Sequence, residues 1–185
     1  MNKLLITGGF IVMILAQWFI PGQMIYQQEQ VLSEGTSYKF KTRPIDPNDP
    51  FRGKFIMLNY EMNKVKKPAE EVDYDQDVYV YITTDKDGFA TATHASKTLR
   101  DTDQDYIVAK ANGTYQDTLN FDLPFNIHYM DENKAYDAEV AVRIATREGI
   151  LTNCYGLVYV KGDRAVLSDV FIDEVSIKDY VDTKE

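Results

Sequence analysis

The chain has 185 residues, of which 44% are hydrophobic, and its formal net charge is -9 at pH 7. This length and hydrophobic content suit one domain with a packed core. Because basic residues are scattered among a larger number of acids, the composition argues against nucleic acid as a partner and against electrostatic binding to anionic lipid. Any attachment to a membrane must therefore come from insertion of apolar residues.

An uncharged apolar segment covers residues 4–20. As a helix it would be roughly 25 Å long, and residues 21–26 can extend it to the thickness of a bilayer. We predict a retained transmembrane anchor over residues 1–22. A cleaved signal peptide is the alternative interpretation, but it requires small residues after the apolar segment, whereas Ala16 is followed by polar and bulky ones.

Charges on the two sides of this segment predict its orientation. Lys3 precedes it, whereas Glu29 and Glu34 follow it without a nearby cluster of basic residues. The positive-inside rule then places the amino end in the cytoplasm and the rest of the chain outside. Trp18 and Tyr26 are suited to an aromatic belt at the outer interface.

Beyond the anchor, residues 23–34 are polar and rich in Gln, and Gly35 stands where a helix C-cap is expected. We predict a short juxtamembrane helix or linker over residues 23–35. In residues 36–43, aromatic residues and Thr alternate with Lys, Arg and Ser, which predicts a strand with one buried face. This strand is expected to end at Pro44.

A rigid loop is predicted next, in the stretch "DPNDPFRGKFIMLNYEM". Its prolines fix φ, and Asp46 and Asp49 can bond their own backbone in Asx-turns. Gly53 permits a turn or bulge before a strand that is apolar on both faces. Such a strand is typical of the middle of a sheet.

Two hairpins are predicted in the following part of the chain. Residues 77–96 read as a strand, a turn at residues 85–88 and a second strand. Residues 105–124 repeat this pattern around Asn112-Gly113, a dipeptide that is typical of two-residue hairpin turns.

The spacing of apolar residues changes over residues 131–147 and predicts an amphipathic helix. A last strand pair is predicted around a turn at residues 161–163. The expected fold class is thus mainly β with one amphipathic helix (α+β): a transmembrane helix followed by an antiparallel β-barrel-like or sandwich domain over residues 36–185.

Metal and thiol chemistry finds little support in the sequence. His94 and His128 lack zinc-ligand spacing, so both are interpreted as ordinary strand or loop residues. Residues 101–105 resemble the start of a calcium loop but lack its later Gly and Glu, which favours a solvated acidic loop. Cys154 is expected to be a small buried apolar residue. We predict no metal site and no cofactor.

An extracytoplasmic β domain behind an anchor also invites comparison with signal peptidases, in which a Lys base activates a Ser nucleophile. Ser33 lacks the Met and Pro that follow that nucleophile, so Lys54 is interpreted as an exposed lysine. We therefore predict that the chain is not an enzyme.

The order of anchor, "TSYKFKTRPIDPNDPFRGKFIMLNYEM", "LPFNIHYMDENKAYDAEVAV" and "VYVKGDRAVLSDVFID" resembles the bacterial membrane-anchored GDYXXLXY family over most of the chain. Gly53, Leu58 and Tyr60 match positions that give the family its name. Lys54 and Phe55 stand where the family usually has Asp and Tyr. Because the carboxylate is absent here, the departure favours interpreting the motif as a turn and strand device. The preceding residues match the family's lead-in at Arg43, Pro44, Asp46, Pro47, Asp49, Pro50, Phe51 and Arg52.

The resemblance implies an accessory protein found beside, or fused to, multi-pass membrane proteins. We accordingly predict a single-pass protein of the bacterial inner membrane whose outer domain is an interaction module for such a partner. Its candidate interaction residues are Arg43, Asp46, Asp49, Arg52, Gly53, Leu58 and Tyr60. The alternative is an envelope sensor or enzyme, either a small-ligand binder or a signal-peptidase-like hydrolase.

Overall fold

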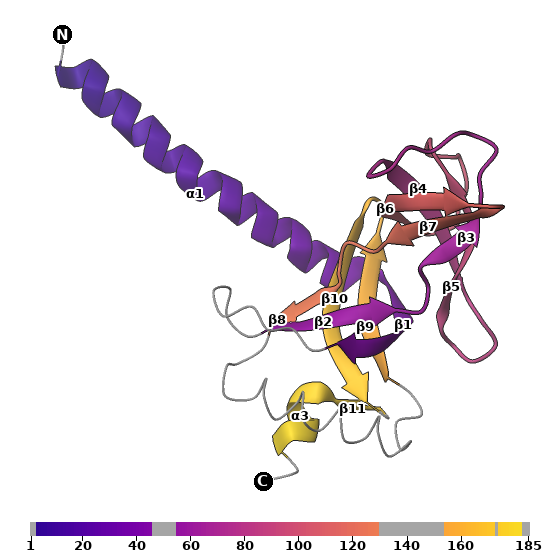
Figure 1. Ribbon diagram of the computed structural model, residues 1–185. Coiled ribbons are helices and arrows are strands. Elements are labelled where there is room, and N and C mark those ends of the chain that lie inside the picture. The colour runs from indigo at the N-terminus through magenta and orange to yellow at the C-terminus, as the bar shows by residue number, and fades with distance from the viewer. Residues whose placement is uncertain (1–2, 46–54, 130–153, 173, 183–185) are drawn as a thin grey trace.

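The computed structural model describes residues 3–45, 55–129, 154–172 and 174–182. One long helix, α1 (Lys3–Glu34), leads from the amino terminus to a β domain (Figure 1). The predicted anchor and juxtamembrane helix are therefore parts of a single continuous helix. At 1.5 Å per residue α1 is about 48 Å long, which exceeds the roughly 30 Å thickness of a bilayer's hydrocarbon core. It is long and apolar enough to cross a membrane.

The β domain contains two antiparallel sheets. The first has six strands in the order β11-β10-β9-β1-β2-β8, and the second has five in the order β3-β7-β6-β4-β5. The first sheet consists of β1 (Thr36–Ile45), β2 (Phe55–Tyr60), β8 (Ile127–Tyr129), β9 (Cys154–Lys161), β10 (Arg164–Ile172) and β11 (Val175–Ser176). The second consists of β3 (Lys64–Lys66), β4 (Asp77–Thr84), β5 (Ala90–Ser96), β6 (Tyr106–Tyr115) and β7 (Thr118–Asp122). A short helix, α3 (Ile177–Asp182), follows β11.

Both sheets contribute to one hydrophobic core. Phe40 and Val158 of the first sheet and Val80, Ile107 and Phe121 of the second belong to the same buried cluster. Alternating buried residues along the strands explain this arrangement, because a strand with one apolar face must cover it against another element. The predicted mainly β, antiparallel class is thus confirmed. The amphipathic helix expected at 131–147 lies outside the described residues.

The prediction of a hairpin turn at Asn112-Gly113 is wrong. Strand β6 continues through both residues, and its register with β7 shifts between Ala111 and Thr114. Gly113 has φ +99° there, so the dipeptide supplies the positive φ of a bulge rather than of a turn. The chain reverses later, after Tyr115, where Gln116 has φ 54°.

Other predicted boundaries agree more closely with the structure. The turn after β4 is present, and the Asp85 side chain accepts hydrogen bonds from the backbone N–H groups of Asp87 and Phe89. The last strand pair is present as β9 and β10. Strand β1 was expected to end at Pro44, but it continues to Ile45, and Pro44 pairs with Leu58 of β2.

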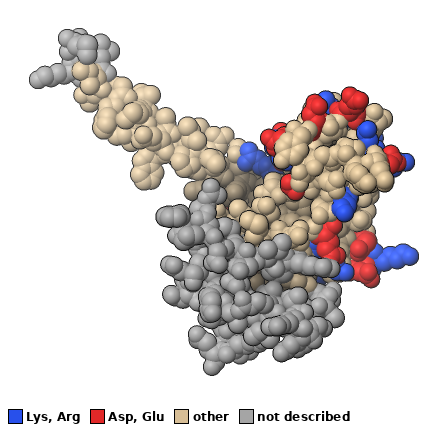
Figure 2. All heavy atoms as spheres, viewed as in Figure 1, with Lys and Arg blue, Asp and Glu red and all other residues tan. Residues whose placement is uncertain are grey.

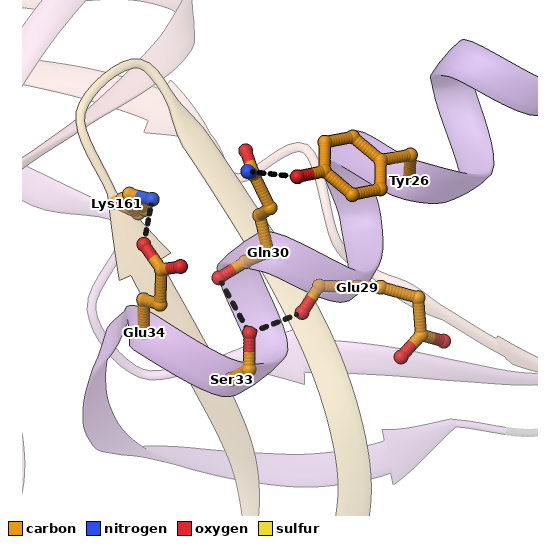
Figure 3. A network of polar contacts seen from close by, with 6 residues as sticks. All are labelled: Tyr26, Glu29, Gln30, Ser33, Glu34 and Lys161. Carbon is orange, nitrogen blue, oxygen red and sulfur yellow. Dashed lines mark hydrogen bonds and ion pairs between the residues drawn. The ribbon is translucent and has the colours of Figure 1, made fainter.

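The helix joins the sheet without an intervening linker. Val31 is only 2% exposed, and the N–H of Gly35 donates to the Val31 carbonyl at 2.9 Å. A Cβ at Gly35 would lie 2.4 Å from that carbonyl oxygen, so this position requires glycine. Figure 3 shows the ion pair of Glu34 with Lys161 on β9, which ties the helix end to the first sheet.

This junction predicts an effect of Val31→Ala. Removing two buried methyl groups should lower the stability of the chain by about 1–2 kcal/mol, or roughly 2–8 °C in melting temperature. Thermal unfolding in mild detergent measures the change. Ile25→Ala is the control, because Ile25 lies on the same helix and is 63% exposed. Equal melting temperatures for the two variants would contradict a packed junction.

Candidate functional site

Of the seven candidate interaction residues, three lie within the described parts of the chain and four do not. Leu58 and Tyr60 lie on β2, and both side chains are buried. Arg43 pairs with Asn59 through the backbone of β1 and β2. Asp46, Asp49, Arg52 and Gly53 lie outside the described residues, so their proposed role in an interaction surface stays a prediction. Lys54, interpreted as an exposed lysine, lies outside them too.

Tyr60 is held in the core by one polar contact and two ring contacts. Its hydroxyl donates a hydrogen bond to the Phe125 carbonyl at 3.0 Å. Its ring meets Phe40 and Phe125 edge to face, with centroids 5.9 and 5.3 Å apart. Burial raises the pKa of the Tyr60 hydroxyl, with a smaller contribution from Cys154, and this favours the neutral donor.

Gly156 on β9 provides the space that Tyr60 occupies. A Cβ at this position would lie 3.0 Å from the Tyr60 hydroxyl oxygen and 3.0 Å from a methyl group of Leu167. We did not single out Gly156 from the sequence. The available signal was a glycine inside a strand pattern, which often marks a close approach of another group to the backbone.

These contacts give the motif residues of β2 a structural role. Leu58 and Tyr60 face the core, while Met57, which precedes Leu58, and Asn59, which lies between them, are exposed. The Leu58 and Tyr60 side chains are only 3% and 5% exposed, so they offer little surface to a partner or substrate. Both residues therefore contribute to the packing of the domain, and their candidate role in an interaction stays a prediction.

A groove lies where α1 meets the two sheets, and we call it the juxtamembrane groove. Its larger part, of about 470 Å³, is lined by Gln28 and Val31 of the helix, by Lys110 and Asp122 of the second sheet, and by Arg164 of β10, among others. A second hollow of about 420 Å³ continues along the helix. It is lined by Pro21, Met24, Ile25, Gln27, Gln28 and Arg164.

The groove carries charge of both signs. Lys110 forms an ion pair with Asp77 at 3.0 Å, and both residues line the groove together with Asp122, Asp163 and Arg164. Figure 2 shows basic atoms at the point where the helix meets the domain. Sequence analysis missed this site, because its residues come from strands that are far apart in the chain.

A second polar cluster surrounds His128 on β8. Its Nε2 atom lies 3.9 Å from Asp169 Oδ1, and it has no hydrogen-bond partner in the described parts of the chain. Asp169 instead accepts hydrogen bonds from the Ser176 hydroxyl at 2.7 Å and from the Val170 N–H at 2.9 Å. In a catalytic triad the serine hydrogen-bonds the histidine, and the histidine hydrogen-bonds the acid. Here the Ser176 hydroxyl bonds the Asp169 carboxylate and not the His128 imidazole, so the three side chains are not arranged as a triad.

The environment of His128 predicts a pH dependence of stability. Burial lowers its pKa below the ordinary value of 6.5, Asp169 opposes this, and Lys178 adds to it. The unfolded chain therefore takes up a proton at a higher pH than the folded chain does. The stabilising contribution is complete above about pH 6.5 and is lost as the pH falls through that value towards the folded pKa.

We expect His128→Phe to flatten the fall in stability between pH 7 and pH 5, as measured by urea denaturation in mild detergent. His94→Phe is the comparison. The pKa of His94 is also lowered, by burial and then by Arg100, but this ring is less buried and stacks on Tyr81. A profile for His128→Phe that runs parallel to the wild type would contradict this prediction.

The acidic segment at 101–105 contributes a structural contact. The Tyr38 hydroxyl donates to Asp105 at 2.8 Å, and burial together with this carboxylate raises the pKa of Tyr38 to about 12. Among the described residues, no group of three or more His, Cys, Asp or Glu is placed to hold a metal ion. Ser33, considered above as a nucleophile, donates to the backbone carbonyls of Glu29 and Gln30 (Figure 3).

Comparison with known proteins gives one family. The sequence model of the GDYXXLXY protein family matches residues 17–169. No curated protein and no solved structure matches the chain. The matched range begins within α1 and ends within β10, so it covers most of the chain. The chain therefore belongs to the GDYXXLXY family.

Proposed function

We propose that this chain is a single-pass protein of the bacterial inner membrane whose outer domain assists a multi-pass membrane protein by binding it, without catalysing a reaction. The observation that carries the proposal is the rigid junction between α1 and the first sheet. Val31 is buried against the domain, and Gly35 closes the helix directly onto β1. A domain fixed in this way presents a constant surface to a neighbour in the membrane.

The position of the groove relative to the membrane supports this role. A hydrocarbon core about 30 Å thick takes up about 20 helical residues, or residues 4–23 if the core begins after Lys3. Gln28 then lies roughly 7 Å beyond the core, at the level of the lipid headgroups. The outer loops of a multi-pass protein lie at the same level, so the juxtamembrane groove can receive one.

An envelope sensor for a small ligand is the second candidate. The volume of the groove, about 470 Å³, falls within the range of small-molecule sites. Ligand sites are, however, mostly apolar with a few polar groups, whereas this groove contains Asp77, Lys110, Asp122, Asp163 and Arg164. Charge of both signs suits the polar rim of a protein interface better.

Native co-isolation tests the proposal. The tagged full-length chain should be extracted in mild detergent and should bring with it a multi-pass membrane protein in a constant molar ratio. Arg164→Glu reverses a charge in the groove and should reduce the yield of that partner, whereas Lys86→Glu, in the turn after β4, should not. A chain that purifies alone from its native membrane would overturn the proposal.

A further inference from the structure

Gln17 is a polar residue inside the membrane-spanning part of α1. It lies between residues 4 and 23, and its side chain is exposed on the helix surface. A side-chain amide has two N–H donors and a carbonyl acceptor, and the hydrocarbon of a bilayer satisfies none of them.

Pro21 leaves a second polar group without its usual partner at the same place. It is inside α1, four residues after Gln17. Proline has no backbone N–H, so the Gln17 carbonyl loses the hydrogen bond that it would accept in a regular helix. In membrane helices such groups are satisfied by neighbouring helices, by Ser or Thr side chains or by ordered water. Gln17 thus presents an amide and a backbone carbonyl to the lipid.

Gln17 belongs to a continuous face of the helix, which we call the Gln17 face. Phe10, Gln17 and Met24 are spaced seven residues apart, and Met13 and Gln28 are four residues from Gln17 and Met24. At 3.6 residues per turn these side chains lie on one side of the helix. Met24 and Gln28 also line the hollow beside Arg164. The face therefore leads from the middle of the membrane into the juxtamembrane groove.

We propose that the Gln17 face binds a transmembrane helix of another membrane protein, and this inference rests on the proposed function. The bound helix carries a hydrogen-bonding side chain opposite Gln17, since donors there would satisfy both the amide and the freed carbonyl. Above the membrane it continues into an acidic or polar segment beside Arg164. Arg164 is exposed, and among the described residues it forms no ion pair.

A second copy of this chain fits the face less well. In a parallel pair related by a twofold axis along the Gln17 face, the two Arg164 side chains would approach each other across that axis. Like charges in such a position repel, which disfavours the pair. A different protein can place an acceptor at this level and so avoid the repulsion.

Site-specific photocrosslinking in the native membrane tests the inference. A photoreactive phenylalanine analogue replaces Phe10 or Phe19, two exposed residues of the same type. Phe10 lies on the Gln17 face, and Phe19 lies on the opposite side of the helix. We expect the analogue at position 10 to crosslink to a different membrane protein, and we expect this protein also to co-isolate with the wild-type chain. The analogue at position 19 should give no such crosslink.

A Gln17→Leu variant should reduce the Phe10 crosslink and weaken association by roughly 3–20-fold, as expected for one or two interhelical hydrogen bonds in a membrane. Gln17→Asn, which keeps the amide, should retain more of the crosslink. Equal crosslinking from the analogue at positions 10 and 19 would overturn the inference. An unchanged yield of the position-10 crosslink in the Gln17→Leu variant would overturn it as well. If the partner still co-isolates in that case, the proposed function stands without it. A crosslink from Phe10 to a second copy would also overturn the inference, in favour of self-association.

Discussion

Replacing Tyr60 with Ala is expected to lower the free energy of unfolding by about 3–5 kcal/mol. The substitution removes a ring that contacts Phe40 and Phe125, and it leaves the Phe125 carbonyl without the hydroxyl that donates to it. Tyr60→Phe retains the ring and should cost less, about 1–2 kcal/mol, because only the hydrogen bond is lost. Urea denaturation in mild detergent, followed by near-ultraviolet circular dichroism, measures both changes.

The adjacent residue of β2 supplies the control for this series. Asn59 has an exposed side chain, so Asn59→Ala should change stability by less than about 0.5 kcal/mol. If Tyr60→Ala were as stable as Asn59→Ala, the motif residue would not be part of the core. The interpretation of the family motif as a structural device would then fail.

The second large effect is expected at Gly156, where valine should destabilise the domain by about 3 kcal/mol and alanine by less. A Cβ here would lie 3.0 Å from the Tyr60 hydroxyl oxygen and 3.0 Å from a methyl group of Leu167, so a larger side chain should crowd these neighbours further. Since Gly156 pairs with Phe40 of β1 on one side and with Val170 of β10 on the other, β9 cannot move aside without disturbing both strands. The same denaturation experiment measures the loss.

A double-mutant cycle identifies the cause. In a Tyr60→Phe background the hydroxyl oxygen is absent, so Gly156→Ala should cost less than it does in the wild type. The methyl group of Leu167 still opposes the new Cβ, so the rescue is expected to be partial. Additive effects of the two substitutions would show that Gly156 and Tyr60 do not compete for the same space.

Local patterns predicted the parts of the fold that depend on neighbouring residues. The apolar helix, the alternation around Phe40 and the turn at Asp85 each follow from residues close together in the chain. The prediction of a turn at Asn112-Gly113 was wrong for a physical reason. A positive φ serves a bulge as well as a turn, and the pairing of β6 with β7 decides between them.

Features that depend on contacts between distant strands were not predictable in this way. The space above Gly156 is filled by Tyr60 and Leu167, which come from two other strands of the sheet. The juxtamembrane groove likewise combines Gln28 of α1 with Lys110 of β6 and Arg164 of β10. A single sequence contains each of these residues, but their proximity follows only from the folded sheets.

The location of the domain outside the cytoplasm is the central claim, because the proposed roles of the groove and of the Gln17 face both depend on it. Two reporters fused after Glu185 test it most directly, one active only outside the cytoplasm and one active only inside. With the amino end and Lys3 inside, the outer reporter should be active and the inner one silent. An active inner reporter with a silent outer one would contradict the account.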